Sequence, residues 1–215
     1  MILVTFALEY EGRAFEKTLS GKGDANVQVL YTGVGLERAE TAVSDFLKTN
    51  AHPKLIVASG FGGGISPEVE RGHIIVDGPE DLPGQVIEKL KDRALMKGVI
   101  CSVTEVLETS EDRSALWQKT GALAVDMESA AIRRSAEPWK IPVLVLRFIT
   151  DAVNDPLPVP ANILFDSTSE RVRVLALLGY LASHPAKIAP FIRFARHCSR
   201  GSHILGKVIA RLLTD

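Results

Sequence analysis

Short apolar segments alternate, over about the first 150 residues, with segments in which apolar positions recur every three or four residues. Several of the short segments are apolar at nearly every position and rich in β-branched side chains, which is typical of strands covered on both faces. They predict strands at residues 2–8, 27–31, 55–59, 73–76, 99–103, 123–125 and 143–149, and the periodic segments predict helices at 36–48, 82–96, 110–120 and 127–136. This alternation predicts a three-layer α/β/α domain around a central mixed, largely parallel sheet.

The pattern changes in the last third of the chain. Residues 155–160 contain three prolines, each of which fixes φ and removes a hydrogen-bond donor, so we expect a loop there. Helical periodicity then resumes at 167–183, 185–197 and 202–213, and the last segment carries its apolar side chains on one face. Because no internal repeat or linker interrupts the chain, we expect a single domain over residues 1–215, with extra C-terminal helices.

Charge is unevenly distributed along the chain. The net charge is −1, yet residues 185–215 hold six basic side chains and one acidic one, a net charge of +5. This basic amphipathic tail suits either a helix packed on the body or on another subunit, or contact with an anionic membrane surface, and the sequence leaves both open. The near-zero total charge gives no reason to expect a nucleic-acid partner.

The sequence lacks a membrane span, a basic leader and a cluster of cysteines, and these absences bear on the compartment and on metal binding. No apolar run approaches the ~18 to 20 residues of a membrane span. The apolar start, residues 1–8, has no basic leader and is followed at once by Glu9. Cys101 and Cys198 are too few and too far apart for a disulfide scaffold or a zinc site. We therefore expect a cytoplasmic protein with no metal.

Two glycine clusters follow predicted strands, at residues 33–35 and 60–64. A dinucleotide-binding fingerprint needs a third glycine three residues after the second, but Arg38 and Ile65 occupy those positions, which disfavours a nicotinamide cofactor. Glycines at strand ends also let a ligand approach the backbone N–H groups. Gly33 and Gly35 are equally suited to simple turns.

Acidic side chains stand at two later strand ends. Asp126 and Glu128 follow one apolar strand and Asp151 follows the next, at the sheet edge where α/β folds bind ligands. A carboxylate such as that of Glu128 can accept two hydrogen bonds from a vicinal diol such as ribose. Simpler roles remain open: Asp126 could cap the next helix, Arg147 could pair with an acid, and residues 11–13 could form a solvated turn after the first strand.

Five segments occur in the order and spacing of the nucleoside phosphorylase and nucleosidase superfamily, and the chain resembles that family from residue 1 to about 155. Asp-Met-Glu-Ser, followed about 20 residues later by Arg-x-x-Thr-Asp, is the most specific pair. The matching segments are 7–11, 33–35, 59–64, 125–130 and 145–151.

The resemblance implies roles for individual residues. Glu128 would bind the ribose 2′ and 3′ hydroxyls, Asp151 would protonate purine N7, and Glu11 would orient the attacking water. Breaking an N-ribosidic bond builds positive charge on the sugar and negative charge on the base. A proton donor beside the base and anionic groups around the ribose would stabilise these two charges. The remaining candidates are Met127, Asp126, Phe61, Gly62 and Gly63 for the substrate, and Arg13, Ser59, Gly33 and Gly35 for phosphate.

One departure from the family bears on the nucleophile. Members that bind phosphate or a nucleophilic water commonly carry a small hydroxyl residue where Phe61 stands. We therefore favour hydrolysis over phosphorolysis, with inorganic phosphate a co-substrate only in the second case and no other cofactor in either.

The C-terminal third narrows the resemblance. Residues 181–185, 191–196 and the amphipathic end resemble the hopanoid-associated branch, whose members remove adenine from adenosylhopane. A lipid-linked adenosine, peripheral membrane contact through residues 185–215 and a homo-oligomer would follow. Alternatives are a purine nucleoside phosphorylase, or a nucleosidase for methylthioadenosine, S-adenosylhomocysteine or futalosine. A catalytically silent nucleoside-binding or membrane-peripheral protein is a further alternative, against which the joint presence of Glu11, Glu128 and Asp151 argues.

Overall fold

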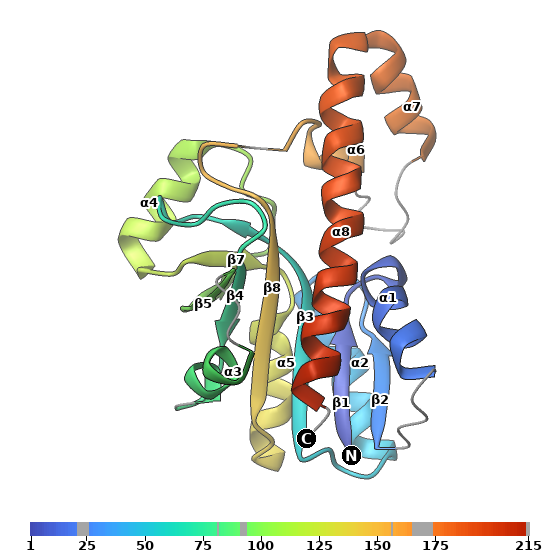
Figure 1. Cartoon of the computed structure of the whole chain (residues 1–215), viewed down its shortest axis with the longest axis vertical. Coiled ribbons are helices and arrows are strands. Elements are labelled where there is room, and N and C mark those ends of the chain that lie inside the picture. Colours follow the sequence, from blue (N-terminus) through green and yellow to red (C-terminus); the bar gives the residue numbers. More distant parts are fainter. Residues whose placement is uncertain (21–25, 81, 91–93, 156, 165–173, 214–215) are drawn as a thin grey trace.

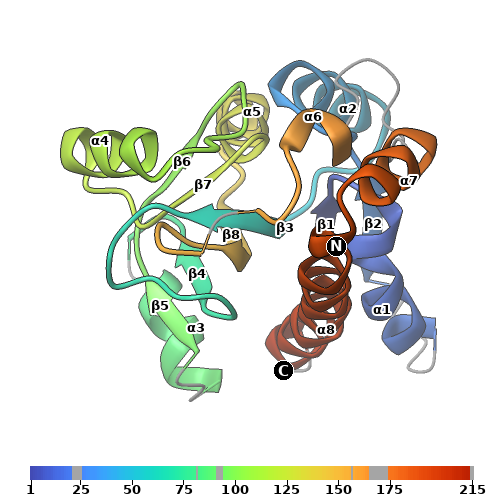
Figure 2. The same cartoon turned by 90° about the horizontal axis from the view of Figure 1, so that it is seen from above.

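A mixed eight-stranded sheet lies between two layers of helices (Figure 1). The computed structural model of the chain describes residues 1–20, 26–80, 82–90, 94–155, 157–164 and 174–213. Seen from above, α2 and α5 lie on one side of the sheet, and α1 and α8 lie on the other (Figure 2). The expected α/β class and three-layer arrangement are confirmed.

Parallel pairing dominates the centre of the sheet. The order is β2-β1-β3-β8-β4-β5, with β7 paired to β3 and β6 to β7. Only the β4–β8 and β3–β7 pairs among the described strands are antiparallel. The strands are β1 (Ile2–Phe6), β2 (Val27–Tyr31), β3 (Leu55–Gly64), β4 (Ile74–Asp77), β5 (Leu95–Lys97), β6 (Ile100–Ser102), β7 (Ala124–Asp126) and β8 (Val143–Asp151).

Alternating side chains of the central strands fill two cores, as the period of two along a strand requires. Ile56 and Val145 face α2 and α5, whereas Val57, Leu144 and Leu146 face α1, α3 and α8. The helices are α1 (Glu9–Ser20), α2 (Leu36–Thr49), α3 (Leu82–Leu90), α4 (Ser110–Thr120), α5 (Ser129–Ala136), α6 (Ala161–Leu164), α7 (Val174–Ser183) and α8 (Ile188–Leu213).

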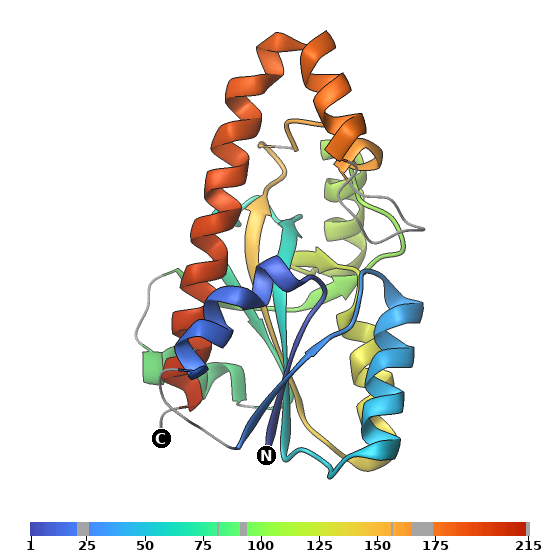
Figure 3. The same cartoon turned by 90° about the vertical axis from the view of Figure 1, so that its right-hand side faces the viewer.

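The long helix α8 packs on the body from about His197 onward. Leu205, Val208 and Ile209 are buried there, and Gly201 and Gly206 allow close approach to β8 and α1. The N-terminal half of α8 and α7 extend beyond the sheet as an arm (Figures 1 and 3). The apolar stripe predicted for residues 202–213 is therefore mainly a packing surface.

Three elements differ from the expectation. Residues 11–13 are not a solvated turn after the first strand but part of the first turns of α1, which begins at Glu9. Gly12 lets this helix pass Phe6, since a Cβ at Gly12 would lie 2.7 Å from that ring. The expected helix 82–96 ends at Leu90, and β5 extends the sheet beside β4. The helices expected at 185–197 and 202–213 are one continuous helix.

Two smaller differences concern boundaries. β3 continues through the glycine cluster to Gly64, because Gly60 to Gly63 pair with the end of β8. The helix expected at 167–183 begins, in the part of the chain that the structure describes, at Val174, and residues 167–173 lie outside the described residues.

Candidate active site

Four acidic side chains gather at the carboxyl ends of β1, β7 and β8. Glu11 lies in the first turn of α1 after β1, Asp126 ends β7, Glu128 precedes α5 and Asp151 ends β8. Each of these residues is at most 5% exposed. Buried carboxylates need partners, since an unpaired charge in a protein interior is strongly destabilising.

Arg147 binds two of the four acids. Its guanidinium lies 2.7 Å from Asp126 Oδ2 and 3.4 Å from Glu128 Oε2, and the Arg147 residue is 2% exposed. Asp126 also accepts a hydrogen bond from the Ser129 backbone N–H at 3.2 Å, so it both caps α5 and pairs with Arg147. The two simple roles that the sequence left open for Asp126 and Arg147 are therefore both filled here.

Glu11 is held at the same edge by backbone donors. Its Oε2 accepts from the Leu8 N–H at 3.1 Å, and its Oε1 accepts from the Phe61 N–H at 3.2 Å. Gly60 adopts a φ of +152°, and a Cβ there would lie 2.7 Å from Arg147 Nη1 and 3.2 Å from both Glu11 oxygens. The lack of a side chain at Gly60 therefore lets Glu11 and Arg147 approach each other.

The three carboxyls in contact with or near Arg147 differ in acidity. Burial raises the pKa of Glu128 to about 7, although the charge of Arg147 opposes the shift. Burial also raises the pKa of Glu11, against the lowering effect of the Leu8 N–H and of Arg147. Burial alone would raise the pKa of Asp126, but its contacts with Arg147 and Ser102 outweigh it and lower that pKa. Glu11 and Glu128 therefore accept protons more readily than ordinary carboxylates.

Asp151 has partners of its own. The guanidinium of Arg113, which reaches in from α4, forms an ion pair with Asp151 Oδ2, and the Thr150 hydroxyl donates to Oδ1 at 2.7 Å. A Cβ at Gly63 would lie 3.4 Å from Asp151 Oδ2, so β3 passes directly beside this carboxylate. Gly62 lies close to β7, since a Cβ at this position would lie 2.9 Å from the Val125 carbonyl oxygen.

The glycine loop after β2 joins the same cluster. Gly33 and Gly35 have φ angles of +77° and +99°, which favour glycine. The Gly35 N–H donates to Glu128 Oε1 at 3.0 Å.

The other candidates differ in how near they lie to the carboxylates: the Phe61 backbone donates to Glu11, whereas Arg13 points to solvent. Arg13 is exposed on α1 and pairs with Glu9 at 3.2 Å. Ser59 is buried on the sheet face that carries Val57 and Phe61, opposite the face of Arg147. The Phe61 ring packs near Tyr10, with ring centroids 5.7 Å apart. Met127, beside Glu128 in sequence, is half-buried.

Two polar residues of the site carried no signal in the sequence. Arg113 belongs to a polar helix, and its acidic partner lies 38 positions away. Ser102 ends β6 and donates a hydrogen bond to Asp126. Neither sits in a recognisable motif, so only the fold brings them to the carboxylates.

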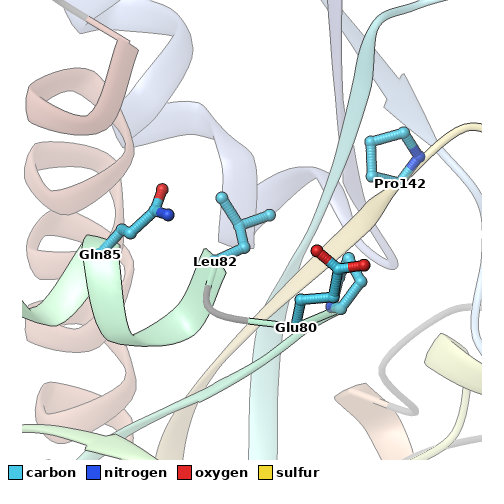
Figure 4. A pocket seen from close by; sticks show the side chains of 5 residues that line it. Glu80, Leu82, Gln85 and Pro142 are labelled. Carbon is cyan, nitrogen blue, oxygen red and sulfur yellow. The ribbon is translucent and has the colours of Figure 1, made fainter.

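The remaining surface offers little chemistry of this kind. A pocket lined by Pro79, Glu80, Leu82, Gln85 and Pro142 lies at the opposite end of β8 from Asp151 and contains a single acid (Figure 4). Within the described ranges, no three histidine, cysteine or acidic side chains form a group that could hold a metal ion. No helix in these ranges is long and apolar enough to cross a membrane.

Comparison with known proteins points to one group. Residues 82–179 match the model of the phosphorylase superfamily. The 5′-methylthioadenosine/S-adenosylhomocysteine nucleosidase of Staphylococcus saprophyticus is 24% identical over 208 residues, covering 81% of this chain and 84% of the relative. The corresponding nucleosidase of Helicobacter pylori superposes with a TM-score of 0.69 at 14% identity, covering 99% and 98% of the two chains. The futalosine hydrolase of Helicobacter pylori has a TM-score of 0.68 at 14% identity and covers 99% and 96%.

Proposed function

Because the chain belongs to the superfamily of nucleoside phosphorylases and nucleosidases, enzymes that cleave glycosyl bonds, we propose that it hydrolyses a 5′-substituted adenosine and releases adenine. The observation that supports this most strongly is the buried cluster of Glu11, Asp126, Glu128 and Asp151, in which two guanidiniums form the ion pairs seen among the described residues. The departing base leaves a ribose with cationic character, and an excess of fixed negative charge stabilises that cation.

Each acid then has a chemical task. Glu128 accepts hydrogen bonds from the ribose 2′ and 3′ hydroxyls, while Met127 packs under the sugar. Asp151 transfers a proton to purine N7 as the bond to C1′ breaks, so the base leaves neutral. Glu11 takes a proton from the attacking water, a role that its raised pKa suits. Water and the nucleoside are the only reactants, and neither a metal nor an organic cofactor takes part.

Hydrolysis is favoured over phosphorolysis by the surroundings of the nucleophile. An attacking phosphate dianion would need cationic ligands, but Arg13 is solvent-exposed and paired with Glu9, and the two buried guanidiniums of Arg113 and Arg147 are already paired with acids. Phe61 adds no hydroxyl where relatives commonly carry one. The four carboxylates would repel phosphate, whereas a neutral water is not repelled.

Product identification tests this function. The intact protein is incubated with adenosine, methylthioadenosine, S-adenosylhomocysteine, futalosine and a lipid-linked adenosine, with and without phosphate. We expect adenine and a free sugar whether or not phosphate is present. A sugar 1-phosphate formed only with phosphate would identify a purine nucleoside phosphorylase, and binding without base release would identify a silent nucleoside-binding protein.

The arm formed by α7 and the N-terminal half of α8 supports a lipid-linked adenosine as the substrate. Residues 171–214 contain no acidic side chain. Arg193, Arg196, Arg200 and Lys207 are exposed at helical spacing along the solvent face of α8. Ile188 and Ile192 are 41% and 44% exposed in the same helix. Cations with adjacent exposed apolar side chains suit an anionic bilayer surface.

The arm is also placed to serve the site. His197, midway along α8, contacts the Ile149 carbonyl oxygen at 3.0 Å, two residues before Asp151, and α7 and the start of α8 project beyond that end of the sheet (Figure 3). We expect salt-sensitive binding to anionic vesicles that is lost when Arg193, Arg196 and Arg200 are changed to Glu. The matched control reverses Lys17, Lys48 and Lys54, which are exposed elsewhere, and should still bind. Absence of vesicle binding at low salt would remove the membrane contact and its support for a lipid-linked substrate.

A further inference from the structure

The side chain of Arg113 is buried beside the proposed general acid. The Arg113 residue is 2% exposed, its Nε donates to the Leu107 carbonyl oxygen at 2.8 Å, and its Nη2 pairs with Asp151. Burial of a guanidinium is unfavourable unless its donors are satisfied, so these contacts fix its position.

The segment that carries Arg113 is attached to the chain that follows Asp151. The Thr109 hydroxyl caps α4 by accepting from the Asp112 N–H at 3.0 Å. The Ser110 hydroxyl donates to the Val153 carbonyl oxygen at 2.7 Å, and Glu108 accepts from the Ala161 N–H at 2.7 Å. A movement of α4 would therefore displace the residues just beyond Asp151.

Both carboxylate oxygens of Asp151 are engaged, Oδ2 by Arg113 and Oδ1 by the Thr150 hydroxyl. A general acid must bring one carboxyl oxygen within hydrogen-bond reach of the base when the glycosidic bond breaks. The pairing with Arg113 must therefore weaken before the reaction.

Gly63 lies directly against the ion pair. A Cβ at this position would lie 3.4 Å from Asp151 Oδ2 and 3.7 Å from Arg113 Nη1, so only backbone separates β3 from both groups. A purine that reaches the backbone of Gly63 would contact both groups.

We propose that Arg113 is a positioning residue that orients Asp151 and gives up this carboxylate to the purine when the nucleoside binds. This inference rests on the proposed function. As the ion pair opens, Asp151 takes a proton from solvent and later transfers it to N7 while the electron pair of the C1′–N9 bond moves to the base. Water adds to C1′ and loses a proton to Glu11, which returns it to solvent.

Among the described residues, α8 and the segment before β4 bring further charged or titratable groups near Asp151. From α8, Cys198 has a thiol whose pKa is raised to about 12 by burial and by the Asp151 charge, so it stays neutral at ordinary pH. His197 of α8 contacts the Ile149 carbonyl oxygen, and Arg71, before β4, pairs with Asp155. Because His197 contacts the chain two residues before Asp151, it needs a control.

The pH dependence of kcat/KM for adenine release by the intact protein tests the proposal. Arg113→Met should lower kcat at least about tenfold and move the alkaline limb of the profile upward by about 1 pH unit or more, because a carboxyl without its cation keeps its proton to higher pH. Arg113→Lys retains the charge without the planar fork, so the limb should stay in place while kcat falls partway. His197→Gln should not move the limb.

The outcome that overturns the proposal is a folded Arg113→Met variant whose alkaline limb coincides with that of the wild type. Thermal unfolding monitors the fold, and Arg113→Gln, which keeps a donor for the Leu107 carbonyl oxygen, gives the same test if the methionine variant unfolds. Asp151→Asn distinguishes a failure of the proposed function from a failure of this inference. If Asp151→Asn is as active as the wild type, the general acid of the proposed function fails. If Asp151→Asn is inactive but the alkaline limb is the same in the wild type and in Arg113→Met, only this inference fails.

Discussion

The Glu128 carboxylate accepts a hydrogen bond from the backbone N–H of Gly35 across 3.0 Å, joining two segments 93 positions apart. The other oxygen of Glu128 lies 3.4 Å from Arg147. This pair fixes the proposed ribose-binding acid against the loop that follows β2. The orientation of Glu128 is therefore set before a nucleoside arrives.

Glu128→Gln should impair ribosides far more than 2′-deoxyribosides. The amide keeps the shape, but each charge-assisted hydrogen bond to a hydroxyl is worth about 1.5 to 3 kcal/mol. We expect kcat/KM for a riboside to fall by at least about tenfold more than for the matching 2′-deoxyriboside. Equal losses on both substrates would mean that Glu128 acts through Arg147 and Gly35 alone.

Glu128 should lose a proton when a nucleoside binds near neutral pH. Burial raises the pKa of Glu128 to about 7, so it is partly protonated without a ligand, whereas two donating hydroxyls favour the ionised form. Calorimetry of a substrate analogue in buffers of different ionisation enthalpy measures the net number of protons exchanged, to which Asp151 contributes an uptake. Between about pH 6 and pH 8 the wild type should release more protons, or take up fewer, than Glu128→Gln. Equal proton exchange by the two proteins would contradict the assignment.

Glu11→Ala should abolish turnover while adenine still binds, because the variant loses the base that accepts the proton of the attacking water. General base catalysis contributes about 10² to 10⁴ in rate. The rate of sugar release, with adenine affinity as the control, measures the effect. Restoration of turnover by phosphate alone, with a sugar 1-phosphate as product, would instead indicate that an anion replaces water.

Gly201→Ala should destabilise the fold through the contact of α8 with β8. A Cβ at Gly201 would lie 2.4 Å from the Phe148 ring, and overpacking of this kind costs about 1 to 3 kcal/mol. Gly179→Ala, on α7, is the matched control, since nothing lies within 4 Å of its Cβ. Urea unfolding should show a loss of stability for the first variant and none for the second. A Gly201→Ala protein as stable as the wild type would mean that α8 is loosely held.

Hydrophobic patterning predicts the central sheet well, because β1, β8 and the first half of β3 are buried on both faces and their side chains are apolar at nearly every position. The same reasoning misses α1, whose first turn holds Glu9 and Glu11 and then a glycine, a composition also typical of turns. It also divides α8, because Gly201 and Ser202 interrupt the apolar period. Close packing against Phe148, invisible in one sequence, explains that glycine.

The site is predictable only in part for a related reason. Glu128 and Asp151 stand directly after apolar strands, so their edge position follows from the chain itself. Arg113 and Ser102 reach the same edge from α4 and β6, and their acidic partners are 38 and 24 positions away. Such contacts depend on the pairing of β7 with β3 and β6, which local patterns do not specify.

The activity of Asp151→Asn tests the central claim, that a purine leaves with a proton from Asp151. The amide preserves the shape of the side chain but has no acidic proton, and general acid catalysis is worth about 10² to 10⁴ in rate. The measurement is kcat for adenine release by wild type and variant, with the nucleoside dissociation constant determined on the same samples. We predict that kcat falls at least about 10²-fold while the dissociation constant changes little. A variant that retains more than about a tenth of the wild-type kcat would contradict the account.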